Sequence, residues 1–238
     1  MNRRRAAVAG VLAAVALAVT AVGFHQKARA RPTLLVLTSL PLLFGETFGL
    51  DQPGSPTLER LQERFVIRPI AATDQASLAG AELLLMAHPR AQTAEALVEL
   101  DQWVTDGGRL LLLADPKLDW PSARPFGDTL RPPPWFADTG LLIHWGVRLT
   151  GGHPDGPAVL EVRGRSILAA SPGRFELLAG SRCTLEASGF IADCPVGKGR
   201  AVLIADADFL NVAGEGALDG PTDANLDLLL DELDSLVE

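Results

Sequence analysis

Residues 82–116 read ELLLMAHPRAQTAEALVELDQWVTDGGRLLLLADP, and this stretch decides the fold class. The apolar run over 82–87 predicts a strand buried on both faces. The helix that follows is capped by Thr93 and stopped by Gly107, and residues 110–114 form a second buried strand. A strand, a helix and a strand in this order make a βαβ unit, which implies parallel strands joined by a right-handed crossover.

The same alternation of strand and helix extends to both sides of this unit. Apolar runs over 33–39 and 65–70 predict two more strands, with a helix capped by Ser55 between them. Downstream, residues 200–205 predict another buried strand and residues 223–237 an amphipathic helix. Together these elements predict an α/β fold in which helices flank a mostly parallel sheet in three layers.

The region between these elements has a different composition. Residues 117–158 are rich in proline and glycine and predict a loop-rich insertion, in which 141–147 forms a short helix or strand around Trp145. From 158 to 194, short β segments alternate with turn residues. We therefore expect an antiparallel β extension of the sheet.

Two cysteines, Cys183 and Cys194, are the only ones in the chain. They bracket a predicted hairpin with a two-residue turn at Ser188-Gly189, and in that register they lie directly opposite each other. A cross-strand disulfide can then form, provided that the protein reaches an oxidising compartment. Two separate buried thiols are the alternative.

The first thirty residues are typical of a targeting segment. Three arginines, 3–5, precede residues 6–24, which carry no charge. At a rise of about 1.5 Å per residue, such a helix reaches across the roughly 30 Å of a bilayer core. We expect a retained signal anchor; a signal peptide cleaved after Ala30 is the alternative, because Ala28-Arg29-Ala30 fits the small-x-small rule. Both interpretations export residues 31–238, which we expect to form a single α/β domain.

The exported part is strongly acidic. The whole chain has a net charge of −8, and residues 1–30 hold five basic and no acidic residues, so the remainder has a net charge of −13. An acidic surface repels phosphates. We therefore expect no nucleic-acid partner, and contact with the membrane through the N-terminal helix alone.

Polar residues follow several of the predicted strands. Because ligands of open parallel sheets bind beyond the carboxyl ends of the strands, we take His88, Asp115, Asp206 and Asp208 as candidate ligand-binding residues. The alternatives are a solvated loop histidine and aspartates that cap turns. An Asp-x-Asp pair after a strand can hold Mg²⁺, but Phe209 does not supply the hydroxyl that follows in phosphohydrolases.

Established catalytic patterns are missing from the sequence. It contains no nucleophile elbow, and Gly197-Lys198-Gly199 precedes a strand, whereas a phosphate-binding loop follows one. The four histidines show no metal-ligand spacing. We predict no catalytic residue, no metal and no cofactor.

Two stretches resemble a known family. Residues 83–116 contain L-D-Q-W-V-x-D-G-G-R followed by L-L-L-L-A-D-P, and residues 197–230 contain G-K-G-R-x-V-L-I-A-D-A-D-F-L followed by Asn225. Both look like the soluble domain of gliding-motility-type ABC-transporter auxiliary proteins and of a related membrane-anchored domain of uncharacterised function. The resemblance implies a class I glutamine amidotransferase-like, flavodoxin-like three-layer fold and adds Asn225 to the candidate ligand-binding residues. The amidotransferase nucleophile position falls near His88 and holds no cysteine, so we expect no glutamine hydrolysis.

Two functional hypotheses follow. The first is a non-catalytic, membrane-tethered extracytoplasmic accessory or binding domain, whose partners are ABC transporter subunits or other membrane proteins. It would be a single-pass protein of the inner membrane with its soluble domain in the periplasm or outside the cell. The alternative is an exported hydrolase, or a metal- or carbohydrate-binding enzyme, that uses Asp115, Asp206 and Asp208.

Overall fold

The computed structural model describes residues 31–44, 54–151, 156–213, 216 and 218–237, of which those from Pro32 onward belong to one compact unit. The predicted membrane helix at 6–24 lies outside the described residues. Within the part of the chain that is described, no helix is both long enough and apolar enough to cross a bilayer.

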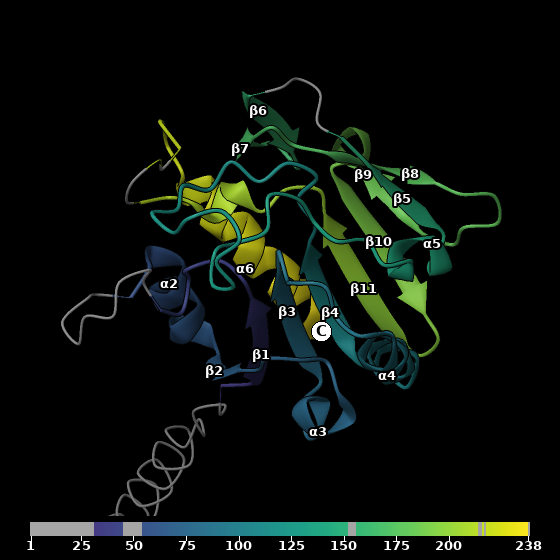
Figure 1. Ribbon diagram of the computed structural model, residues 1–238. Helices are drawn as coiled ribbons and strands as arrows, with labels where there is room; N and C mark the ends of the chain where they lie inside the picture. Colours follow the sequence, from purple (N-terminus) through teal and green to yellow (C-terminus); the bar gives the residue numbers. More distant parts are fainter. Residues whose placement is uncertain (1–30, 45–53, 152–155, 214–215, 217, 238) are drawn as a thin grey trace, which may run out of the picture. The chain divides into compact units, whose positions relative to one another are not determined.

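A seven-stranded sheet forms the centre of the domain, in the order β2-β1-β3-β4-β11-β10-β9 (Figure 1). The first five strands in this order are parallel, and β10 and β9 continue the sheet with antiparallel pairings. Their bounds are β1 Thr33–Thr38, β2 Val66–Pro69, β3 Leu83–Ala87, β4 Arg109–Leu113, β9 Thr184–Glu186, β10 Ile191–Val196 and β11 Gly199–Ile204. The mostly parallel sheet with an antiparallel extension is confirmed.

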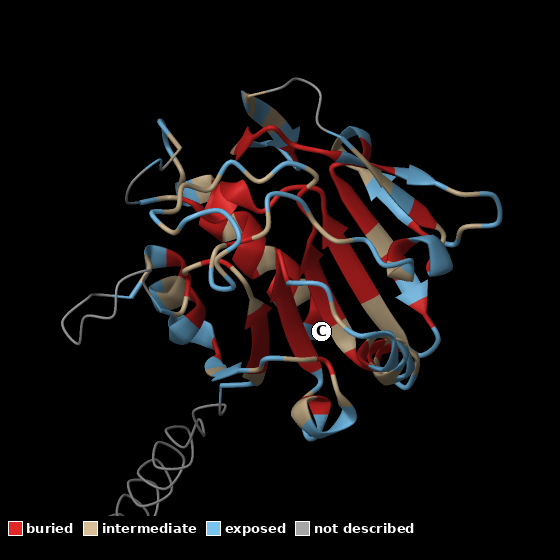
Figure 2. Cartoon of the chain, in the orientation of Figure 1, coloured by how far each residue is buried: buried red, intermediate tan, exposed pale blue. Residues whose placement is uncertain are grey.

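Burial follows the position of each strand in the sheet. All five residues of β3 are buried, since helices cover both faces of the central strands. The edge strand β2 is largely exposed, and Figure 2 shows this change from red to pale blue. Each buried leucine of the central strands contributes about 2 kcal/mol through the removal of apolar surface from water.

Among the described residues, four helices flank the sheet: α2 Pro56–Arg64, α3 Gln75–Leu78, α4 Ala94–Thr105 and α6 Asp223–Val237. Contacts pair α2 with α6 and α3 with α4, and the two pairs cover opposite faces of the sheet (Figure 1). Ser55 and Thr93 cap α2 and α4 as expected. After α4, a Cβ on Gly108 would lie 2.4 Å from the Trp103 indole, so only glycine allows that ring to pack there.

The region between β4 and β9 forms short elements: α5 Leu141–His144, β5 Val147–Thr150, β6 Pro157–Val162, β7 Arg165–Ala170 and β8 Arg174–Leu177. The strands β5 and β8 pair with each other, as do β6 and β7, in two small sheets separate from the central one. Of the range 141–147, Leu141–His144 is helical and Val147 already begins β5, and Trp145 is buried beside α5.

The cysteine hairpin has the expected register but a different turn. Glu186 pairs with Ile191, which places Cys183 opposite Cys194, and the two form a disulfide with a Cα–Cα distance of 4.1 Å. The predicted bridge is confirmed. Ser188-Gly189 lie at the centre of the turn as predicted, with Phe190 N donating to Ala187 O at 3.1 Å. The connection is longer than two residues, because strand pairing ends at Glu186 and Ile191 and residues 187–190 all lie between the strands. Both turns are centred on the same point, so the register is unchanged.

Candidate functional site

The carboxyl end of the sheet brings the predicted aspartates together. Neighbouring parallel strands β4 and β11 end side by side, with Leu113 paired to Ile204. Asp115 follows β4, and its Oδ2 accepts from the backbone N–H of Ala207 at 2.9 Å, while Oδ1 accepts from Lys117 N at 2.8 Å. The side chain of Asp115 therefore ties the end of one strand to the loop that follows the other.

Asp206 and Asp208 lie in that loop and are also buried. Asp206 Oδ1 accepts from Phe209 N at 2.7 Å, which closes a short 3-10 turn, and Asp208 Oδ2 accepts from Asp119 N at 2.7 Å. The turn-capping interpretation is confirmed for Asp206, whereas Asp208 joins its loop to the distant residue Asp119. Asp206 Oδ2 and Asp208 Oδ1 have no hydrogen-bond partner among the described residues.

Burial and mutual repulsion change how these carboxyl groups titrate. Burial, followed by the charge of Asp115, raises the pKa of Asp208 to about 8. Burial also raises the pKa of Asp115 to about 6, and burial with the charges of Asp115 and Asp208 raises the pKa of Asp206 well above its usual range. Asp206 and Asp208 therefore keep their protons at neutral pH, because burial disfavours the charged carboxylate and the neighbouring negative charges repel one another.

The loop-rich insertion lies over this end of the sheet. Phe136 N donates to Asp115 O at 2.7 Å, and Leu118 N donates to Pro134 O at 3.0 Å. Asp119, which donates its N–H to Asp208, also accepts from Ser171 Oγ at 2.8 Å. The aspartates are thus covered, and the described residues include no group of three or more His, Cys, Asp or Glu arranged to hold a metal ion.

His88 is fully buried at the end of β3. Its Nε2 lies 2.9 Å from Pro133 O, its backbone has a φ of +45°, and burial lowers its pKa to about 4. The solvated-loop alternative for this histidine is wrong, because the insertion covers the end of the strand. The ring is held by Pro133 rather than by the aspartates.

Asn225 joins three elements through one side chain. Its Oδ1 accepts from Leu168 N at 3.0 Å, and its Nδ2 donates to Leu168 O and Phe209 O, each at 2.8 Å. The amide thus attaches α6 to β7 and to the turn after β11. A ligand-binding role for the five predicted residues stays a prediction.

Sequence reasoning missed two acids, the buried Glu232 and the exposed Asp119. Glu232 on α6 is buried and forms an ion pair with Arg163 at 2.7 Å, and burial raises its pKa. Its spacing from Leu229, Leu233 and Leu236 places it on the apolar face of the helix, so the 3.6-residue period contains the signal. Asp119 lies in an irregular loop, where no periodic pattern marks it.

Solved structures with similar folds differ widely from the chain in sequence. The mmIFT52 N-terminal domain is 14% identical, with a TM-score of 0.53 over 86% of this chain and 97% of that one. The cytoplasmic protein STM1381 of Salmonella typhimurium LT2 is 10% identical, with a TM-score of 0.53 over 86% of this chain and 99% of that one. At this identity the likeness shows the fold alone, and it confirms the class I glutamine amidotransferase-like fold.

Larger enzymes also contain a similar region. The chain covers 34% of an exo-β-1,4-mannosidase from an Opitutaceae bacterium, with 15% identity, 87% of this chain aligned and a TM-score of 0.46. It thus spans about a third of that enzyme's length, and the likeness carries no argument. A comparison with curated proteins found no match.

One family model matches the chain. It covers residues 31–152, just over half of the chain, and its description is an ABC-type uncharacterized transport system. The matched residues run from β1 through the βαβ unit and the insertion to β5. The chain therefore belongs to the family described as ABC-type uncharacterized transport system.

Proposed function

We propose that this chain is a non-catalytic, membrane-tethered accessory or binding domain of an ABC-type transport system. Family membership supports the association with transport. The observation that carries the non-catalytic part is the closed carboxyl end of the sheet. Asp115, Asp206 and Asp208 are at most 2% exposed, and most of their hydrogen bonds hold the chain's own loops in place.

The proposed location is outside the cytoplasm. The disulfide between Cys183 and Cys194 supports an oxidising compartment. The uncharged run over 6–24 supports a single inner-membrane anchor, with residues 31–238 in the periplasm or outside the cell. A protease added to intact spheroplasts is then expected to degrade residues 31–238; full protection would contradict this location.

Transporter subunits are the proposed partners, and the insertion offers a surface for them. Phe126 is 86% exposed, Trp135 63% and Leu130 55%, all on the segment that covers the carboxyl end of the sheet. Exposed aromatic side chains on one loop are typical of protein contacts. Arg131 lies over the Phe126 ring at 4.3 Å from its centroid, which orders this part of the loop.

Co-purification from solubilised membranes tests the proposal. The chain is expected to co-purify with transporter subunits. A Phe126→Ser/Trp135→Ser variant is expected to co-purify with a much smaller amount of these subunits. Val98→Ser is the matched control, because Val98 is 69% exposed but lies on α4. A chain that purifies alone, or a loss equal in control and variant, would contradict the proposal.

The alternative is an exported hydrolase, or a metal- or carbohydrate-binding enzyme, that uses the same aspartates. The pKa of about 8 for Asp208 favours it, since strongly perturbed carboxyl groups collect at functional sites. In that case Asp206→Asn abolishes an activity while the protein stays folded. If the Asp206→Asn variant and the unmodified chain hydrolyse each tested substrate at the same rate, the alternative loses its support.

A further inference from the structure

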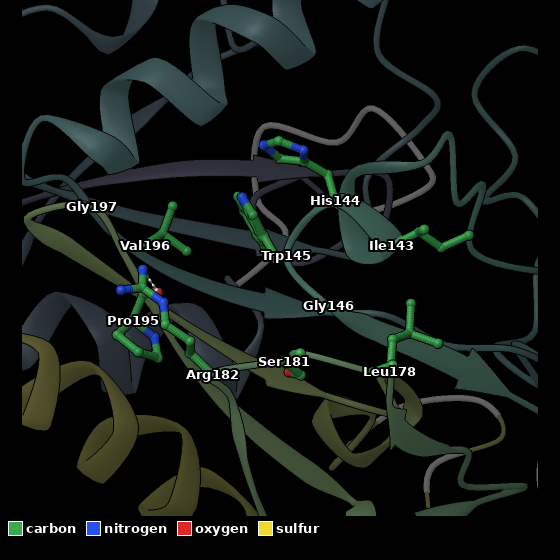
Figure 3. A pocket seen from close by; sticks show the side chains of 12 residues that line it. Ile143, His144, Trp145, Gly146, Leu178, Ser181, Arg182, Pro195, Val196 and Gly197 are labelled. Atoms are coloured by element: carbon green, nitrogen blue, oxygen red, sulfur yellow. Dashed lines mark hydrogen bonds between the residues drawn. The ribbon is translucent and has the colours of Figure 1, made fainter.

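A hollow of about 390 Å³ lies beside the turn that precedes β11 (Figure 3). The aspartates follow the carboxyl ends of β4 and β11, so the hollow is at the opposite end of these strands. Three segments far apart in the sequence line it: residues 143–146 at the end of α5, the loop 178–182, and the turn 195–197. Its volume falls within the roughly 300–1,000 Å³ of small-molecule sites.

The walls of the hollow are held in place by the protein itself. The Cys183–Cys194 disulfide joins the loop directly to the strand that enters the turn. Leu178 N donates to Gly146 O at 2.9 Å, and a Cβ on Gly146 would lie within 3.1 Å of Ser181, so these two segments touch. A ligand would therefore meet a preformed site and would not need to order its walls.

One part of the lining is apolar. Trp145 is only 8% exposed, and its Nε1 donates to Asp101 Oδ1 at 2.7 Å, which fixes the orientation of the indole. Ile143, which is 54% exposed, and Leu178 lie together at the other end of the hollow in Figure 3. These side chains present a surface for an aromatic or branched aliphatic group.

The other part of the lining is cationic. The guanidinium of Arg182 lies on the same side of the hollow as Trp145 (Figure 3) and donates one hydrogen bond, from Nη2 to Pro195 O at 3.2 Å. No carboxylate of the described residues forms an ion pair with Arg182, whereas Arg165 and Arg200, for example, are each paired. Arginine is always charged and matches the geometry of a carboxylate.

We propose that this hollow binds a small organic carboxylate that carries an aromatic or branched aliphatic group. The carboxylate contacts Arg182 and the hydroxyl of Ser181, and the apolar group packs against Trp145 and Leu178. This site is independent of the proposed contact between the insertion and transporter subunits, so either proposal can fail alone.

Titration calorimetry of the full chain in lipid nanodiscs tests the site, with 4-phenylbutyrate and its uncharged amide as probes. The acid is expected to bind at least about tenfold more tightly than the amide. Arg182→Gln is expected to bring the acid to the affinity of the amide and to leave the amide unchanged. Arg174→Gln is the matched control, an exposed arginine on β8 that does not line the hollow, and is expected to bind as the unmodified chain does.

Leu178→Asp provides a second variant, because it removes an apolar contact and adds a charge that repels the acid. It is expected to abolish binding of the acid, with the melting curve confirming that the variant is folded. Equal binding of acid and amide by the unmodified chain would overturn the proposal. So would a failure of both probes to bind, or an Arg182→Gln variant that keeps the full preference for the acid.

Discussion

At the carboxyl end of the sheet three buried aspartates hold the protein's own loops, whereas at the amino end a disulfide holds a hollow with an arginine in its lining. The charged groups at the first end are covered and repel one another. The charged group at the second end is exposed and has no carboxylate partner among the described residues. Perturbed carboxyl groups here make hydrogen bonds that join the protein's own loops. The proposed carboxylate site lies at the other end of the sheet, away from the carboxyl ends of the strands, where ligands of open parallel sheets usually bind.

Removal of the disulfide, which lies beside the hollow, is expected to have the largest effect on the stability of the protein. A Cys183→Ser/Cys194→Ser variant is expected to lose about 3 kcal/mol in the free energy of unfolding, because a loop with a sequence separation of 11 is no longer closed in the unfolded chain. Urea unfolding of variant and unmodified chain, with and without reductant, measures this. If reductant still lowered the free energy of unfolding of the variant, the stability could not be assigned to the Cys183–Cys194 disulfide.

Asn225→Ala tests the junction at the carboxyl end. The free energy of unfolding is expected to fall by about 2–3 kcal/mol, since Leu168 and Phe209 would keep buried backbone groups without a partner. Asp227→Ala on the same helix, which removes a half-exposed ion pair with Arg60, is the control and is expected to change stability by less than about 1 kcal/mol. Equal effects of the two variants in chemical denaturation would show that Asn225 does not connect these elements.

The stability of the carboxyl end of the sheet is expected to depend on pH through Asp208. The folded-state pKa of Asp208, about 8, exceeds the value of about 3.9 for an unfolded aspartate. The folded state thus binds more protons than the unfolded state between these values, so its stability is highest near pH 4 and falls as pH rises through 8.

Asp208→Asn is expected to remove this dependence. The amide still accepts from Asp119 N, and the variant is expected to be about 2 kcal/mol more stable than the unmodified chain at pH 9, with a smaller difference at pH 5. Denaturation at both pH values measures it, with the exposed Asp219→Asn as the control. A constant difference at the two pH values would contradict the buried-proton explanation.

The smallest expected effect concerns the rim of the hollow. Ile143→Ser changes an exposed side chain, so the free energy of unfolding is expected to change by no more than about 0.5 kcal/mol. The affinity for 4-phenylbutyrate is nevertheless expected to fall several-fold, because an apolar contact is lost. Calorimetry and denaturation of the same sample check both values; an unchanged affinity would remove Ile143 from the site.

Much of the central sheet could be predicted because its signals are local. The five-residue apolar runs of β3 and β4, the caps Ser55 and Thr93, and the glycine stop after α4 each depend on neighbours within a few positions. The convergence of Asp115 with Asp206 and Asp208 followed from parallel strands that end at one edge.

The position of the loop-rich insertion over the carboxyl end of the sheet could not be predicted in the same way. The contacts of His88 and Asp119 were not recognised, because their partners, Pro133 and Asp208, lie 45 and 89 positions away. No period relates such residues, and a proline-rich segment has no repeating pattern to indicate which face of the domain it covers.

By itself the sequence determined the parallel core, the capped helices and the opposition of Cys183 and Cys194, since side-chain period and hairpin register are properties of short stretches of chain. Only the tertiary structure decided that the insertion closes the carboxyl end and that α5, the loop 178–182 and the turn 195–197 enclose a hollow. The physical reason is that burial and cavity shape depend on packing between distant segments, which no local pattern encodes.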